Sequence, residues 1–206
     1  MVRVKICGIT NAADARHAVR SGADALGFVF AKSPRRVSAE TARKITGSIP
    51  ADSATVGVFV DEPAERLLRI AERCRLTVVQ LHGDEKPSLA RRLQKNGLQV
   101  LKALRVGAQD DLDRMDDWPA DALLFDTSAS GRFGGTGRTF DWGLLAGRRI
   151  RLPWFVSGGL NPGNVKKLLS ALQPYGVDVS SGVEISPGKK SAALVREFIK
   201  NAKSTG

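Results

Sequence analysis

The sequence contains little cysteine, few aromatic residues and no long apolar run. Only Cys7 and Cys74 are cysteines among 206 residues, so at most one disulfide can form, and neither a disulfide scaffold nor a cysteine-rich zinc site can be built. The longest apolar stretches, such as 26–31 and 56–60, fall far short of the roughly 20 residues that span a bilayer. We therefore expect no membrane span.

The first residues also lack the pattern of a secretory leader. Arg3 and Lys5 interrupt the apolar residues at the start, and no small-residue cleavage site follows. We therefore expect a cytoplasmic protein. Hydrophobic residues make up 42% of the chain and glycine adds 21 residues, which excludes a disordered chain and predicts a single packed domain spanning residues 1–206.

Basic residues outnumber acidic ones, 32 to 21, which gives a formal net charge of +11. This charge favours anionic partners, and both nucleic acid and phosphorylated metabolites are candidates. The basic residues occur as scattered pairs, such as Arg91-Arg92 and Lys166-Lys167, beside a single tyrosine. No RNA-recognition signature accompanies them. We therefore interpret most of the charge as a solvated surface and prefer a small anionic metabolite over nucleic acid.

Short runs rich in β-branched residues alternate with longer segments of helical character along the whole chain. Strands are predicted at 2–7, 23–30, 55–60, 77–82, 99–105, 122–126, 154–157 and 177–180. Helices are predicted at 12–21, 39–47, 63–73, 86–95, 108–115, 141–146, 162–172 and 192–202.

This strict alternation predicts an α/β fold with a parallel sheet and helices outside it. Eight units of about 26 residues each favour closure into a single-domain (β/α)8 TIM barrel with a parallel eight-stranded sheet. The rival is an open doubly wound sheet. Its glycine fingerprint is missing, because the first strand is followed by Cys7-Gly8-Ile9-Thr10.

Side-chain alternation along the strands predicts which residues face the barrel interior. Val4 and Ile6 are expected to face outward toward helices, which turns Lys5 and Cys7 inward. The same rule gives an inward polar set of Lys5, Cys7, Gln80, His82, Asp126 and Asp178. Their predicted convergence at the carboxyl ends of the strands, where barrel enzymes hold their active sites, indicates catalysis.

Each of these residues also has a structural interpretation. Cys7 could be a small buried hydrophobe, and Asp126 could cap or turn the chain. His82 fits an acid–base group and a structural histidine equally well. Lys5, one layer below Cys7, is expected to form an ion pair that favours the thiolate. Two histidines and two distant cysteines give no metal-ligand spacing, so no metal is expected.

Glycine-rich loops follow three of the predicted strands. They are residues 131–137, Ser157-Gly158-Gly159 and Ser180-Ser181-Gly182. Barrels often bind phosphate with the loops after strands seven and eight, where exposed N–H groups and a helix dipole attract an anion. Glycine pairs also serve ordinary tight turns. Two such loops in the last two units nevertheless predict a phosphate site.

Several motifs together resemble those of the phosphoribosylanthranilate isomerase family, an enzyme family of tryptophan biosynthesis. The matching segments are Val4-Lys5-Ile6-Cys7-Gly8-Ile9-Thr10, Gly27-Phe28-Val29-Phe30, Val79-Gln80-Leu81-His82-Gly83, Gly134-Gly135-Thr136-Gly137, Phe140-Asp141-Trp142, Ser157-Gly158-Gly159-Leu160-Asn161-Pro162, Asp178-Val179-Ser180-Ser181-Gly182-Val183-Glu184 and Pro187-Gly188-Lys189. They cover nearly the whole chain.

The resemblance implies a cofactor-free Amadori rearrangement of an aminoaldose phosphate to an aminoketose phosphate. It implies that Cys7 is the general base and Asp126 the general acid. Arg35 is expected to bind the anthranilate carboxylate, with Arg36 as the neighbouring alternative, and Asp178 and His82 to contact the substrate. The phosphate is expected on the backbone of Gly135, Gly158, Gly159, Ser181 and Gly182.

Two other functions remain as alternatives. One is another phosphosugar-binding barrel enzyme, such as an epimerase, lyase or synthase. The other is a basic nucleic-acid-binding protein, which the scattered charges disfavour. A bifunctional isomerase that also serves histidine biosynthesis would usually need a longer chain with aspartate in place of Cys7. The predicted partner is a small anionic phosphosugar, with no nucleic acid and no membrane, and the chain is expected to be a monomer or a homodimer.

Overall fold

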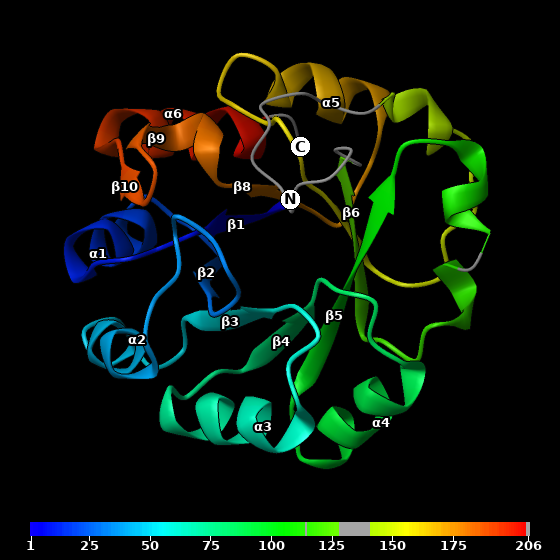
Figure 1. Ribbon diagram of the computed structural model, residues 1–206. Coiled ribbons are helices and arrows are strands. Elements are labelled where there is room, and N and C mark those ends of the chain that lie inside the picture. The colour runs from blue at the N-terminus through cyan, green and yellow to red at the C-terminus, as the bar shows by residue number, and fades with distance from the viewer. Residues whose placement is uncertain (114, 128–140, 205–206) are drawn as a thin grey trace.

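The computed structural model describes residues 1–113, 115–127 and 141–204. Eight parallel strands close into a barrel in the order of the sequence, with helices around it (Figure 1). The strands are β1 (Arg3–Cys7), β2 (Ala25–Val29), β3 (Ala54–Phe59), β4 (Val78–Leu81), β5 (Gln99–Val106), β6 (Ala122–Thr127), β7 (Trp154–Val156) and β8 (Gly176–Val179). The predicted (β/α)8 barrel is confirmed.

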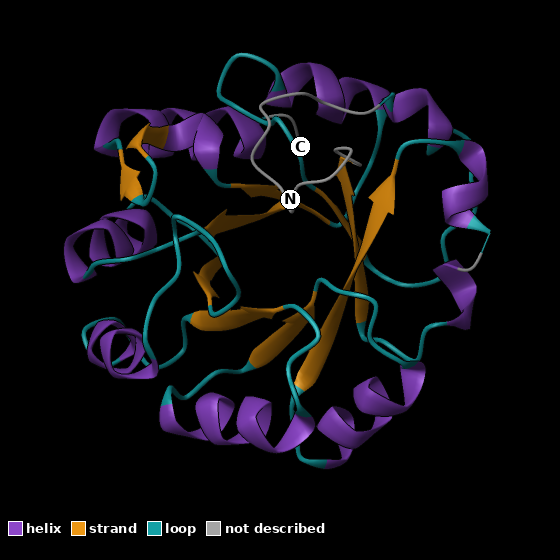
Figure 2. Cartoon of the chain, viewed as in Figure 1, coloured by secondary structure: helices purple, strands orange, loops and turns teal. Residues whose placement is uncertain are grey.

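Among the residues that the structure describes, six α-helices form the outer layer of the barrel (Figure 2). They are α1 (Ala12–Arg20), α2 (Ala39–Thr46), α3 (Ala64–Arg73), α4 (Pro87–Lys95), α5 (Val165–Ala171) and α6 (Ala192–Lys203). Side-chain oxygens of Asn11, Ser38 and Ser191 cap α1, α2 and α6 by accepting backbone N–H groups of the first turn. None of the helices in the described ranges is long and apolar enough to cross a bilayer.

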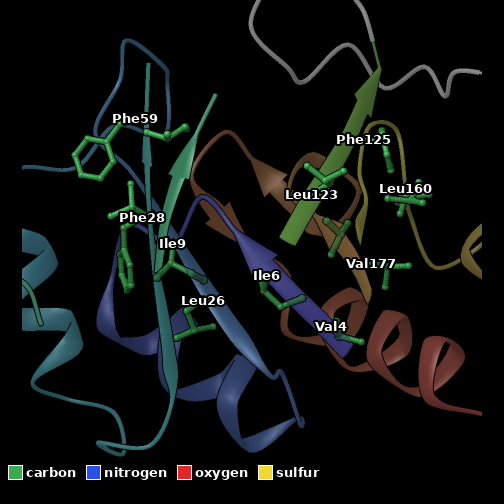
Figure 3. Packing of buried hydrophobic residues seen from close by; sticks show 14 of the residues in the cluster. Val4, Ile6, Ile9, Leu26, Phe28, Phe59, Leu123, Phe125, Leu160 and Val177 are labelled. Atoms are coloured by element: carbon green, nitrogen blue, oxygen red, sulfur yellow. The ribbon is translucent and has the colours of Figure 1, made fainter. Parts of the chain in front are cut away.

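Alternation along the strands produces two apolar layers. Outward side chains such as Val4, Ile6 and Phe125 are fully buried between the sheet and the helices (Figure 3). Burial of each such side chain stabilises the fold by roughly 1.5–3 kcal/mol. A separate cluster inside the barrel contains Leu101, Ala103 and Leu124. Toward the carboxyl ends of the strands, several inward positions carry polar side chains instead, among them Gln80, Asp126 and Asp178.

Two of the predicted helices are wrong. Residues 108–115 form the short 3-10 helix η1 (Gln109–Leu112) and the start of a second, η2 (Met115–Asp117). Aspartates are poor residues for a helix interior because their side chains compete for backbone groups. Asp111 does this here by accepting the backbone N–H groups of Gly107 and Ala108. Residues 141–146 likewise contain only the 3-10 helix η3 (Trp142–Leu144), which includes a glycine.

The chain after β7 and β8 also differs from the prediction. Helix α5 begins at Val165, three residues later than expected, because Asn161 and Asn164 hold the preceding turn by accepting backbone N–H groups. After β8 the chain forms the 3-10 helix η4 (Ser181–Val183) and then an antiparallel hairpin of β9 (Glu184–Ser186) and β10 (Lys189–Lys190). The hairpin was not predicted, and it brings Glu184 opposite Lys190.

Candidate active site

A cavity at the carboxyl ends of the strands contains most of the predicted site. Cys7 on β1 and Asp126 on β6 both line it. His82 after β4, Asp178 on β8 and Gln80 on β4 line the same cavity. Strand parity therefore predicted this grouping correctly for five of its six residues, whereas the sixth, Lys5, does not line the cavity.

Cys7 is held at the end of β1 in a narrow space. Its side chain is buried, with 8% of the residue exposed, and Gly27 lies opposite it on β2. A Cβ on Gly27 would lie 2.7 Å from the Cys7 Sγ, so only glycine leaves room for the thiol. Burial raises the pKa of Cys7 above its ordinary value, although the charges of Lys5 and Lys190 act in the opposite direction. Lys5 therefore acts in the predicted direction, toward the thiolate, but desolvation outweighs it and the net pKa of Cys7 stays above its ordinary value.

Lys5 is paired with Asp178. The Lys5 Nζ donates to Asp178 Oδ1 at 2.9 Å, and both side chains are buried. Burial alone would lower the pKa of Lys5, but the carboxylate of Asp178 and the neighbouring Cys7 raise it above its ordinary value. The second carboxylate oxygen of Asp178 accepts the hydroxyl of Ser157 at 3.1 Å. Asp178 thus lines the cavity with both oxygens already oriented.

Asp126 belongs to a chain of hydrogen bonds. Its Oδ1 accepts the backbone N–H of Thr127 at 2.9 Å, and its Oδ2 lies 3.2 Å from Nε2 of His82. The other ring nitrogen of His82, Nδ1, lies 2.8 Å from Nε2 of Gln80. Asp126 has 6% of its surface exposed, so the carboxyl reaches the cavity while its oxygens stay held. His82 is therefore a direct partner of Asp126.

Arg35 lines the cavity from the loop after β2, whereas Arg36 is exposed and is not a lining residue. Arg35 donates three hydrogen bonds to the carboxylate of Glu184, the shortest at 2.7 Å. Lys190 also donates to Glu184, at 2.8 Å. Burial alone would raise the pKa of Glu184, but these hydrogen bonds lower it below its ordinary value. The carboxylate therefore fixes the guanidinium in one orientation.

Sequence reasoning missed the roles of Glu184 and Lys190. A signal was present, because the two residues flank the Pro187-Gly188 turn at positions that face each other across a short hairpin. It also missed an apolar wall of the cavity, which consists of Val29, Ala31, Val58 and Val60. Valines at the ends of β2 and β3 are equally typical of an ordinary hydrophobic core, so the sequence gives no signal for this wall.

The two glycine loops line the cavity on the side of β7 and β8. Gly158 and Gly159 have φ values of +85° and +66°, which glycine adopts without strain. A Cβ on Gly158 would clash with the Thr127 hydroxyl and lie 2.8 Å from Asp126 Oδ1. Ser181 also lines the cavity, at the first residue of η4.

The remaining predicted phosphate residues lie elsewhere. Gly182 is not a lining residue of the cavity, but it packs so closely against the backbone carbonyl of Leu160 that no side chain fits. It joins the two loops. Gly135, and the rest of the predicted loop 131–137, lies outside the described residues.

A closed parallel barrel with a thiol, a carboxyl–imidazole pair and two glycine loops at one mouth defines a (β/α)8-barrel enzyme. Comparison with known proteins narrows the class. The family model for N-(5'-phosphoribosyl)anthranilate (PRA) isomerase matches residues 4–201. The chain belongs to this family.

Relatives match along nearly the full length. An N-(5'-phosphoribosyl)anthranilate isomerase of Rubrobacter xylanophilus is 50% identical over 206 residues, covering 99% of this chain and 100% of that protein. One similar solved structure is that of monomers generated from the dimeric phosphoribosylanthranilate isomerase of Thermotoga maritima. It is 44% identical to this chain with a TM-score of 0.88, and the match covers 99% of this chain and 100% of that one. A phosphoribosylanthranilate isomerase in complex with reduced 1-(o-carboxyphenylamino)-1-deoxyribulose 5-phosphate has the same identity, coverage and TM-score.

Proposed function

We propose that the protein converts N-(5-phosphoribosyl)anthranilate into 1-(2-carboxyphenylamino)-1-deoxyribulose 5-phosphate, an isomerisation in tryptophan biosynthesis. Family membership supports this reaction. The observation within the molecule that carries it is the shared cavity of Cys7 and Asp126. The reaction needs an acid at the ring oxygen and a base at the neighbouring carbon, and these two groups supply that pair.

The chemistry balances without a redox cofactor, and Asp126 and Cys7 each transfer one proton to or from the substrate. Asp126, when protonated, donates its proton to the ribose ring oxygen, the C1′–O bond breaks, and the ring opens to an iminium ion. The Cys7 thiolate then removes the proton from C2′, which gives an enolamine. Tautomerisation, in which C1′ gains a proton and the 2′-hydroxyl loses one, gives the ketone. Cys7 returns its proton to solvent, and Asp126 regains one, so the enzyme ends as it began.

Substrate binding uses the walls of the same cavity. The Gly158, Gly159 and Ser181 backbone is suited to the phosphate, because N–H groups of tight glycine loops approach an anion closely. Arg35, held by Glu184, presents a fixed cation to the anthranilate carboxylate. Asp178, which lines the cavity, is the proposed acceptor of a hydrogen bond from the anthranilate N–H.

Two further features complete the binding scheme. The apolar wall of Val29, Val58 and Val60 suits the flat face of the aromatic ring. Gly182 contributes by letting the two phosphate loops meet, and Gly135 remains part of the proposed phosphate site on the strength of its motif alone.

The cellular setting is proposed on the same basis. We place the reaction in the cytoplasm, because membranes retain phosphorylated metabolites inside the cell, and we treat residues 1–206 as one domain. The dimeric relative supports a homodimer as one of the two expected states, the other being a monomer. Sedimentation of the purified protein distinguishes them.

The direct test follows the substrate. Purified protein is incubated with freshly made phosphoribosylanthranilate in a buffer that contains a chelator, and the loss of anthranilate-type fluorescence is recorded. The proposal expects rapid loss together with formation of the aminoketose phosphate. Fluorescence that decays only at the rate of the buffer blank would contradict it. Activity that appears only with added divalent metal would favour another phosphosugar enzyme.

A further inference from the structure

Gln80 is a buried amide that contacts the general acid only through His82. Gln80 lies on β4 with 1% of its surface exposed. Its Nε2 lies 2.8 Å from His82 Nδ1, whereas its Oε1 is buried and has no hydrogen-bond partner among the residues that the structure describes. One end of the amide is therefore held by the imidazole, and the described protein groups do not hold the other.

The two ends of the amide demand opposite tautomers of the imidazole. A neutral histidine has one N–H donor and one bare nitrogen. When the Gln80 NH2 group faces Nδ1, that nitrogen accepts, and Nε2 carries the proton. The Nε2–H then donates to Oδ2 of Asp126, 3.2 Å away, which suits a carboxylate.

Rotation of the amide by half a turn reverses the direction of both hydrogen bonds, the one between Gln80 and His82 and the one between His82 and Asp126. The Gln80 Oε1 then faces Nδ1 and accepts its N–H, and Nε2 is bare. A bare Nε2 accepts an O–H from Asp126, which suits the protonated acid. Because Oε1 has no described partner to lose, rotation exchanges one hydrogen bond to His82 for another.

We propose that Gln80 is a positioning residue for the general acid: the orientation of its amide selects which nitrogen of His82 carries the proton, and His82 thereby stabilises Asp126 either as carboxylate or as acid. This inference rests on the proposed function for the catalytic role of Asp126. The distances that carry it do not depend on that role.

The protons balance between the two arrangements. When Asp126 is a carboxylate, the pair of His82 and Asp126 holds one proton, on Nε2 of His82; we call this the carboxylate arrangement. When Asp126 is protonated, which we call the acid arrangement, the pair holds two protons, one on Asp126 and one on Nδ1 of His82. The change from the first arrangement to the second therefore takes up one proton from solvent. Donation to the substrate ring oxygen returns the pair to one proton. His82 remains neutral in both arrangements, and each amide orientation fits one of them.

Other charged groups surround Gln80, His82 and Asp126, and they also affect how the activity depends on pH. Cys7 on β1, Lys32 and Arg35 after β2, and Asp178 on β8 line the same cavity. Arg105 on β5 is paired in register with Asp126, and its guanidinium donates to the backbone carbonyl of His82 at 3.3 Å.

The tautomer of His82 can be read directly by 15N NMR of the substrate-free protein. The sequence has only two histidines, and His17, whose Nε2 lies 2.8 Å from the carbonyl of Ala192, serves as the internal reference. In the wild type we expect one protonated and one bare nitrogen in His82. Gln80→Met, which removes both donor and acceptor, should give averaged shifts, and Gln80→Glu, whose ionised carboxylate can only accept, should protonate Nδ1.

Kinetics provide the second readout. Gln80→Met is expected to lower kcat about ten- to a hundredfold, less than loss of an acid itself, with KM little changed. The basic limb of its kcat–pH profile should move to lower pH, because no amide oxygen then holds the Nδ1–H tautomer that stabilises protonated Asp126. Gln173→Met, which removes an exposed glutamine outside the cavity, is the matched control and should behave as the wild type.

The outcomes separate this inference from the proposed function. Ring shifts of His82 that stay unchanged in both Gln80 variants would overturn the inference, whatever the activity. So would two protonated ring nitrogens in the wild type near neutral pH, a measurement that needs no variant to fold. An inactive wild type with the expected tautomer changes would instead overturn the isomerase assignment and leave the role of Gln80 toward His82 supported.

Discussion

Removal of the Glu184 carboxylate should destabilise the protein far more than removal of a surface carboxylate. Glu184 has 4% of its side chain exposed and binds two cations, Arg35 at 2.7 Å and Lys190 at 2.8 Å. The Lys190 side chain is only 2% exposed. Glu184→Ala therefore leaves two cations without their anion, one of them fully enclosed. Breaking a buried pair in this way typically costs about 3–5 kcal/mol, and we expect the free energy of unfolding to fall by about that amount.

The assay is urea unfolding followed by the fluorescence of the three tryptophans. Glu65→Ala is the matched control, because Glu65 also pairs with an arginine at 2.8 Å, but with side chains 50% and 62% exposed. Its loss should be small, since solvent screens such a pair. Glu184→Ala should also raise KM, because Arg35 is no longer held. Equal losses of stability in the two variants would refute the reasoning.

Three further predictions concern single groups of the site. Because burial raises the pKa of Cys7, Cys7 in the substrate-free protein should react with iodoacetamide more slowly than a free cysteine peptide at neutral pH, and the rate should rise at alkaline pH. Peptide mapping separates this reaction from that of Cys74. Reactivity at neutral pH equal to that of the peptide would contradict the prediction. Gly158→Ala should lower kcat, because its Cβ would press on Asp126, whereas Gly97→Ala, which has the same sign of φ and open space around it, should not; equal kcat values would argue against the contact. The pKa of Glu184 is lower in the folded protein than in the unfolded chain, so the ionised side chain stabilises the fold above about pH 4.3 and this stabilisation is lost as the pH falls further. The difference in unfolding free energy between the wild type and Glu184→Gln should therefore shrink in acid. A difference that stays constant would exclude this linkage.

Much of the fold and half of the site follow from alternation in the sequence. Period-two patterns in the strands place Cys7, His82, Asp126 and Asp178 on one face, and a parallel barrel brings the carboxyl ends of all strands to one mouth. These inferences depend only on local periodicity and on closure. They therefore hold without knowledge of any particular contact.

The contacts that set orientation and charge could not be predicted in the same way. Arg35 and Glu184 are 149 positions apart, and their pairing depends on how a hairpin after β8 folds back over the loop after β2. The pKa of Cys7 depends on whether desolvation or nearby lysines dominate, which only the packing decides. The amide of Gln80 can be placed inward from sequence, but only the three-dimensional structure shows that its oxygen has no hydrogen-bond partner among the described residues.

The division of labour between Cys7 and Asp126 can be measured by steady-state turnover of phosphoribosylanthranilate in Cys7→Ala and Asp126→Asn, with Cys74→Ala as a buried-cysteine control outside the cavity. With folding verified by circular dichroism, we expect kcat to fall about 10²- to 10⁴-fold in each of the first two variants and to stay near the wild-type value in the third. Turnover near the wild-type rate in either Cys7→Ala or Asp126→Asn would contradict the assignment of base and acid.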